Sequence, residues 1–377
     1  MTFSCSRQLL DHAIEQSSQK SGFREGPAEA PTRITNNDIL NMAYGSTRRR
    51  SMEPTAPSRP PSVTTIRYRS STLRFRDDQA RAVQRGCEHR PILAIQVAYG
   101  TGKTVVGAVI AARVATPGIL VIATASTNVA VAQFADTRLQ LTDYQHLPVV
   151  RFVADTALRE RAPVTTVDLH NIFQGLLTNF PNAFGPRDEE RLRAYAHRRL
   201  IERLLFNSAD TVNLTDEERE EFRIAEDENS EATEYAVELM IRVRFPAILC
   251  ITTSSLLKST RPGGLFHELL ASCKIIIGDE ASQIPEPASA AMILRFPAAR
   301  HIYIDNAHQL ALHLRCPASS LQARLGARGV MDILREVPLA LLVTTFGAHP
   351  SLNSLPNRLV YNGTLVSEHG PRTAHFW

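Results

Sequence analysis

ILAIQVAYGTGKT, residues 92–104, joins a short apolar run to a glycine-rich loop. The run Ile92-Leu93-Ala94-Ile95 has the length and composition of a buried strand, and the small apolar stretch after the loop, residues 105–114, suits a buried helix. Pro117-Gly118 ends this stretch, and a second apolar run follows at residues 119–122. The order strand, helix, strand is typical of one unit of a parallel sheet.

More apolar runs of strand length lie farther along the chain, and a helix-like stretch, residues 77–85, precedes the first strand. The later runs span Val149–Val153, Ala247–Thr252, Lys274–Gly278 and His301–Ile304. Their apolar residues are continuous rather than alternating, which indicates strands buried on both faces. The sequence therefore predicts an α/β fold with a doubly wound parallel sheet.

Two segments depart from this pattern. Residues 1–74 are rich in Ser, Pro, Thr and Arg and show little apolar periodicity, so we expect a mostly disordered basic arm. Such an arm tethers nucleic acid, serves as a nuclear address, or is a solvated tail without a specific role. Residues 186–242 carry dense Arg and Glu at helical spacing, which predicts a helical insertion with solvated faces.

Composition narrows the class of protein. Of 377 residues, 44% are apolar, which allows a sizeable core, and the formal net charge of +4 suits a nucleic-acid binder and an ordinary enzyme equally. The five cysteines show no Cys-x-x-Cys spacing, so neither a zinc site nor a disulfide framework is expected. No stretch reaches the ~18 consecutive apolar residues of a membrane span. We expect a soluble cytoplasmic or nuclear protein without a membrane partner.

The glycine-rich loop has the chemistry of a phosphate-binding site. Glycines let backbone N–H groups turn towards phosphate oxygens, and the N-terminus of the following helix adds partial positive charge. Lys103 is expected to pair with the β and γ phosphates, and the Thr104 hydroxyl to bind Mg²⁺. A chance Gly-Lys-Thr turn is the competing interpretation, but this lysine, one of only four, closely follows a strand. Val97 replaces the usual first glycine. The residues expected to hold ATP are Gly100, Thr101, Gly102, Lys103 and Thr104.

An acidic pair follows a later apolar run, residues 275–278. A carboxylate pair at the C-terminal end of a buried strand lies where a parallel sheet presents its ligand site. Asp279 is expected to hold Mg²⁺, and Glu280 to orient or deprotonate the attacking water. An isolated Asp-Glu pair more often begins a solvated turn. Downstream of a phosphate loop, the pair predicts the second half of a Mg-ATP site.

The run Asp279-Glu280-Ala281-Ser282-Gln283, followed by Pro285-Glu286-Pro287, resembles motif II of the up-frameshift subfamily of superfamily 1 helicases, which act in nonsense-mediated decay. Residues 75–83 resemble the adenine-reading Q motif of this family, and Gln79 would read the base. The resemblance implies a RecA-like P-loop NTPase fold, with ATP and Mg²⁺ as cofactors. It also implies backbone contacts to single-stranded RNA or DNA, which are sequence-tolerant. By their positions in motif Ia and in a later Thr-rich strand end, the residues implied in these contacts are Thr127, Asn128, Thr252 and Thr253.

The similarity becomes weaker towards the C-terminus. Residues 305–310 align with the Gly-Asp-x-x-Gln-Leu motif III and keep Gln309, implied as the γ-phosphate sensor, but Asp305 and Asn306 replace its first two residues. Residues 342–350 resemble motif IV, where Phe346 would stack on adenine and Gly347 stands in place of an arginine. The resemblance implies a RecA-like domain at residues 75–315 and the start of an incomplete second one at residues 316–377, before motifs V and VI.

The sequence therefore predicts an ATP hydrolase of helicase type that acts on single-stranded nucleic acid, RNA or DNA, and meets other proteins of an RNA-processing complex. The alternative is a catalytically impaired copy that binds ATP or nucleic acid as a scaffold. Gly347 stands where the family has an arginine, and an arginine finger contributes about 10³ to 10⁵ in rate, so its loss would leave very slow hydrolysis. A GTPase is disfavoured because no Asn-Lys-x-Asp occurs, and a transporter-type ATPase because no Leu-Ser-Gly-Gly-Gln occurs.

Overall fold

The computed structural model describes residues 65–195, 231–308, most of 328–347, and 350–368, with a few isolated positions outside these ranges. By its internal contacts the chain divides into two compact units. Of the described residues, one unit contains 150–195 and 231–246, and the other contains 65–149, 247–308 and the described part of 328–368. We call residues 97–104, which the sequence predicts to bind phosphate, the phosphate loop. This loop and the acidic pair, Asp279 and Glu280, both belong to the second unit.

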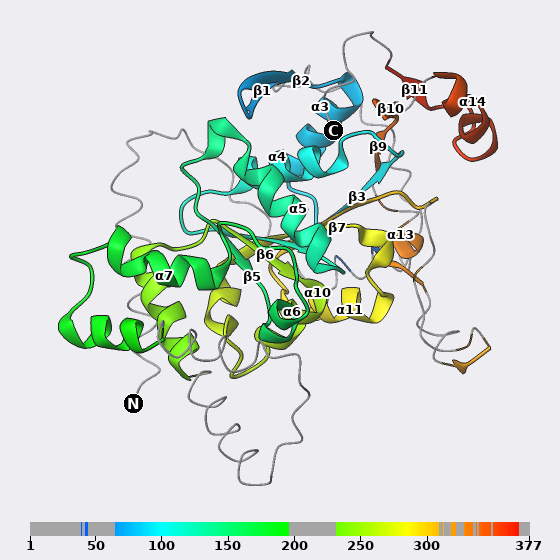
Figure 1. Cartoon of the computed structure of the whole chain (residues 1–377). Coiled ribbons are helices and arrows are strands. Elements are labelled where there is room, and N and C mark those ends of the chain that lie inside the picture. The colour runs from blue at the N-terminus through cyan, green and yellow to red at the C-terminus, as the bar shows by residue number, and fades with distance from the viewer. Residues whose placement is uncertain are drawn as a thin grey trace, which may run out of the picture. The chain divides into compact units, whose positions relative to one another are not determined.

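A parallel sheet forms the centre of this second unit (Figure 1). Its strands lie side by side in the order β6, β4, β7, β8, β3, β9, and every neighbouring pair is parallel. Their bounds are β3 (Ile92–Val97), β4 (Leu120–Ala125), β6 (Ile248–Thr252), β7 (Cys273–Asp279), β8 (Arg300–Asp305) and β9 (Leu339–Leu342). All residues of β4, β6 and β8 are buried, because helices cover the sheet. The predicted α/β class with a parallel sheet is confirmed.

Helices flank the sheet and follow the strands along the chain. They are α3 (Asp77–Cys87), α4 (Lys103–Val114), α5 (Asn128–Leu139), α10 (Thr253–Ser259) and α11 (Glu286–Arg295), with short 3-10 turns η1 (Thr142–Tyr144), η2 (His267–Ser272) and η3 (Ala281–Gln283). Helix α4 is buried from Val106 to Ala112 because its residues are small and apolar around the whole circumference. It packs on α3, on α5 and on the sheet, which fixes the phosphate loop at its N-terminus.

A β-hairpin precedes α3, and it corrects one expectation. Strands β1 (Thr65–Tyr68) and β2 (Ser71–Arg74) pair antiparallel in a segment that the sequence assigns to the disordered arm. The hairpin is held by distant contacts. The Arg69 N–H donates to the carbonyl of Gln140 at 2.8 Å, and the Thr142 hydroxyl donates to the carbonyl of Arg69 at 2.9 Å. The rest of residues 1–64 lies outside the described residues, apart from Ile39, Met42 and Ala43.

The C-terminal segment folds beside the phosphate loop. It contains α13 (Val330–Ile333), β9, β10 (Thr344–Thr345), α14 (Pro350–Leu359) and β11 (Val366–Ser367), and β10 pairs parallel with β11. Within the region predicted to begin a second RecA-like domain, β9 pairs with β3 and so extends the sheet that carries the phosphate loop. The predicted boundary at residue 316 stays a prediction.

The other unit contains most of β5 (Val149–Phe152), with α6 (Asp155–Arg159) and α7 (Leu169–Asn179). Its core includes an ion pair between Arg151 and Asp168, 2.8 Å apart and fully buried. The predicted insertion, residues 186–242, is described only at its ends, where residues 186–195 and 231–243 are helical. Among the helices that the structure describes, none is long and apolar enough to span a bilayer.

Candidate functional site

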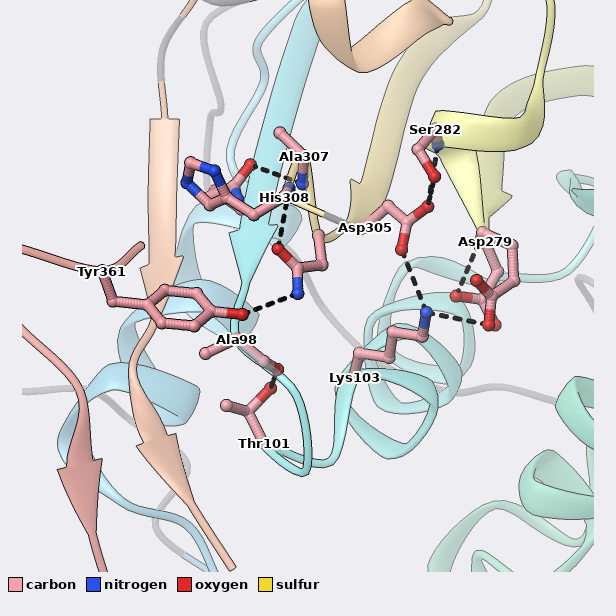
Figure 2. Close-up of polar contacts among 12 residues, drawn as sticks. Ala98, Thr101, Lys103, Asp279, Ser282, Asp305, Ala307, His308 and Tyr361 are labelled. Atoms are coloured by element: carbon pink, nitrogen blue, oxygen red, sulfur yellow. Dashed lines mark hydrogen bonds and ion pairs between the residues drawn. The ribbon is translucent and has the colours of Figure 1, made fainter. Parts of the chain in front are cut away.

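Three neighbouring strands bring the candidate residues together. In the order β7, β8, β3, the C-terminal ends of these strands carry Asp279, Asp305 and the phosphate loop. Figure 2 shows the Lys103 side chain, at the start of α4, paired with Asp305 and lying beside the acidic pair. Because parallel strands end on the same edge of a sheet, residues separated by about 200 positions meet here.

The phosphate loop adopts the backbone geometry that its glycines predict. Gly100 and Gly102 have φ angles of 66° and 76°, which lie in the left-handed region. Thr101 between them is buried, and its hydroxyl donates to the carbonyl of Ala98 at 2.9 Å. Val97 is the last residue of β3 and is buried, so its side chain fills the core instead of shaping the turn.

Gln79 lies directly against this loop. Its side-chain Nε2 donates to the carbonyl of Thr101 at 2.9 Å, and its Oε1 accepts from the backbone N–H of Arg76 at 3.0 Å. The residue is buried near the start of α3. Gln79 therefore neighbours the loop, and its amide is hydrogen-bonded to the loop itself. Reading of adenine by Gln79 stays a prediction.

Lys103 is the charged centre of the site. Its Nζ lies 2.8 Å from a carboxylate oxygen of Glu280 and 3.0 Å from one of Asp305. Burial lowers the pKa of Lys103, but the negative charges of Asp305, Asp279 and Glu280 outweigh it, and the net effect raises this pKa above its ordinary value. Lys103 is therefore fully charged and ready to pair with an anion.

The acidic pair divides into a buried and a half-exposed member. Asp279 ends β7 and is buried, and desolvation raises its pKa to about 7, although the charge of Lys103 acts in the opposite direction. Glu280 has a φ of 51° in the left-handed region, which is strained for a residue with a side chain. Its side chain is 37% exposed. The Glu280 carboxylate reaches Lys103 and remains partly open to solvent.

Asp305 is a site residue that the sequence analysis treated only as a departure from motif III. Its side chain is fully buried, and its Oδ2 accepts from the backbone N–H of Ser282 at 2.8 Å and from the Ser282 hydroxyl. Its Oδ1 accepts from Lys103. The available signal was its place directly after the apolar run 301–304, at the same sheet edge as Asp279.

The metal assignment rests on few protein ligands. Thr104 is the second residue of α4 and is half-buried, next to Lys103 in the chain. Among the described residues no group of three or more acidic, histidine or cysteine side chains gathers to hold a metal. One hydroxyl and one carboxylate fit Mg²⁺ only when phosphate oxygens and water complete its six ligands. Mg²⁺ binding at Thr104 and Asp279 stays a prediction.

The predicted nucleic-acid contacts lie at the ends of β4 and β6, which are neighbours in register at Ala125 and Thr252. Thr127 caps α5 and is exposed, and its hydroxyl accepts from the N–H of Ala130. Asn128 follows it and is half-buried. Thr252 caps α10 in the same way, accepting from the N–H of Ser255. The four predicted threonine and asparagine residues therefore share one rim.

Thr252 and Thr253 differ from the other two residues because both are buried. The Thr253 hydroxyl shares a hydrogen bond of 3.1 Å with that of Thr124. A side chain in this position supports the packing of α10 on the sheet. Thr253 can reach a ligand only through its backbone.

The C-terminal segment closes one side of the loop. The N–H of Phe346 donates to the carbonyl of Gly100 at 2.9 Å, and the Phe346 side chain is half-buried. Gln309, the predicted γ-phosphate sensor, lies outside the described residues. Nearby, the rings of Tyr99 and Tyr361 lie 5.9 Å apart, an aromatic pair that the sequence analysis did not identify.

No protein-family model matches the chain. A search of curated proteins likewise finds none that matches it. The function of the site is therefore inferred from its own residues and geometry.

Proposed function

We propose that this chain is a RecA-like ATPase domain of superfamily 1 helicase type, which binds Mg-ATP at the phosphate loop and single-stranded nucleic acid at the adjacent rim. One observation carries the proposal. Lys103 follows a left-handed glycine turn at the start of a buried helix and lies within 3.0 Å of carboxylates at the ends of two neighbouring strands. That combination of turn, helix N-terminus and lysine suits a triphosphate.

Each residue has a role that its environment supports. The N–H groups of residues 100–104 would hold the phosphates, and Lys103 would neutralise charge between the β and γ phosphates. Mg²⁺, held by Thr104 and Asp279, would neutralise further phosphate charge. Glu280, half-exposed beside Lys103, would orient the attacking water and accept its proton. Gln79 would read adenine after releasing the carbonyl of Thr101.

The rim formed by Thr127, Asn128 and Thr252 supports the nucleic-acid part of the proposal. The exposed Thr127 hydroxyl and the half-buried Asn128 amide favour contacts with phosphate and sugar rather than with base edges, while the buried Thr252 would contribute through the N-terminus of the helix it caps. We therefore propose binding of single-stranded RNA or DNA without strong sequence preference. The rim lies at the ends of strands β4 and β6, and β4 neighbours β7, the strand that carries Asp279. This proximity would couple nucleic-acid binding to the nucleotide site.

A second candidate function is a nucleotide-binding or nucleic-acid-binding scaffold that turns over slowly. The observation that favours it is the full engagement of Lys103 by Glu280 and Asp305. A lysine paired with two carboxylates must exchange them for phosphate before catalysis. Gly347 also brings no cation to the loop, although it lies beside Gly100.

The test is steady-state ATP hydrolysis by the purified chain with and without single-stranded RNA or DNA, followed by strand displacement. We expect hydrolysis that nucleic acid stimulates. Glu280→Gln is the matched control, because it keeps the size of the side chain and should reduce turnover by about 10² or more while ATP still binds. ATP binding without turnover would favour the scaffold. Hydrolysis equal in wild type and Glu280→Gln would refute the assigned role of Glu280.

A further inference from the structure

Asp305 is the buried member of the pair of carboxylates that hold Lys103. It ends β8, the strand between β7 and β3, so it faces both the acidic pair and the phosphate loop. Its side chain is 0% exposed, whereas that of Glu280 is 37% exposed. Glu280 can therefore turn into water when it leaves Lys103, and Asp305 has no such alternative.

Two hydrogen bonds fix the Asp305 carboxylate. Its Oδ2 accepts from the N–H and from the hydroxyl of Ser282, which belongs to η3 directly after the acidic pair. Its Oδ1 faces Lys103 at 3.0 Å (Figure 2). Because Oδ2 is held in place, Oδ1 is a preformed acceptor. Oδ1 accepts from Lys103 as a phosphate oxygen would.

Nucleotide binding disturbs this arrangement in two ways. If Lys103 moves to the phosphates, the Asp305 carboxylate stays buried without its counter-charge, which is costly in a low-dielectric site. If Lys103 stays between Asp305 and the phosphates, the phosphates must approach the buried negative charge of Asp305, and the repulsion is poorly screened there. Both effects oppose binding.

We propose that Asp305 competes with the nucleotide phosphates for Lys103 and thereby holds down the affinity of the phosphate loop for Mg-nucleotide. This inference rests on the proposed function, since it assigns a regulatory residue to the same site. Asp305 is an affinity-setting residue, positioned by Ser282.

The experiment is calorimetric titration of a non-hydrolysable ATP analogue with Mg²⁺ into the full chain, comparing wild type with Asp305→Asn. The amide keeps the size of the side chain and can still accept from Ser282, while the negative charge is lost. We expect Asp305→Asn to bind about tenfold more tightly or better. Glu280→Gln, which removes the exposed carboxylate, should produce a smaller gain.

Ser282→Ala is the second variant and leaves Asp305 in place. It removes one of the two hydrogen bonds that stabilise the carboxylate charge, so Asp305 depends more on Lys103, and we expect Ser282→Ala to bind nucleotide more weakly than the wild type. This variant tests the proposal even if Asp305→Asn fails to fold, which a thermal unfolding curve reveals. Equal or weaker binding by folded Asp305→Asn, or equal or tighter binding by Ser282→Ala, overturns the inference and leaves the proposed function standing. No binding by wild type or variants overturns both.

Discussion

Replacing Gly100 by alanine should loosen the junction between the phosphate loop and the C-terminal segment. A Cβ at Gly100 would lie 2.8 Å from the Thr345 hydroxyl oxygen, 2.9 Å from the Gly347 nitrogen and 3.0 Å from the Gly347 Cα. Two of these atoms belong to the backbone, so no side-chain rotation relieves the contact. Overpacking costs about 1–3 kcal/mol, and the left-handed backbone adds about 1–2 kcal/mol. The expected loss of stability is about 2–5 kcal/mol.

Gly363→Ala is the matched control for this variant. Gly363 has a φ of 77°, close to that of Gly100, but a Cβ there meets nothing within 4 Å. Its replacement should cost only the backbone strain, about 1–2 kcal/mol. Urea unfolding followed by circular dichroism measures both. If Gly100→Ala is no less stable than Gly363→Ala, the C-terminal segment does not pack on the phosphate loop and our account of this junction fails.

Three further predictions concern single groups. Mg-ATP affinity should fall as the pH drops below about 7, because burial raises the pKa of Asp279 to about 7 and only the ionised carboxylate binds Mg²⁺; a flat profile in calorimetric titrations would contradict this. In the nucleotide-free protein the stability of the fold changes with pH in the opposite direction. Because the folded pKa of Asp279 exceeds the unfolded one, the stability contributed by the protonated carboxyl is lost as the pH rises through 7. Thr127→Ala should weaken binding of single-stranded nucleic acid, measured by fluorescence anisotropy, whereas Thr253→Val should cost about 1 kcal/mol of stability and leave that binding unchanged. Asp168→Asn should destabilise the other unit by about 3–5 kcal/mol, because it leaves the Arg151 charge buried without its partner; limited proteolysis of that unit would show no change if the pair were dispensable.

The strands and the helix after the phosphate loop could be predicted because their patterns are local. The apolar run at residues 92–95 became β3, and residues 274–278 became most of β7. Burial on both faces leaves few polar residues in such strands, so composition alone indicates them. The hairpin β1–β2 had no comparable pattern. Its stability depends on contacts with residues 140–144, about 70 positions away.

The site was predictable where a motif fixes a backbone shape and not where partners meet across the sheet. Gly100 and Gly102 adopt left-handed φ angles, which glycine adopts without strain and which a glycine-rich turn allows one to expect. The pairing of Lys103 with Asp305 depends on the insertion of β8 between β7 and β3, and strand order cannot be read from apolar runs. For the same reason the burial of Thr253 against β4 was missed.

The central claim is that Lys103 anchors Mg-ATP at the phosphate loop, and calorimetric titration of Mg-ATP into wild type and Lys103→Ala tests it most directly. Our account predicts saturable binding of one nucleotide by the wild type and a loss of at least about tenfold in affinity for Lys103→Ala, because no other cation is seen paired with Glu280 or Asp305 among the described residues. Lys274→Ala, which changes the exposed lysine of β7 away from the loop, should bind as the wild type does. Equal affinity of the wild type and Lys103→Ala for Mg-ATP, or no binding by either, would contradict the account.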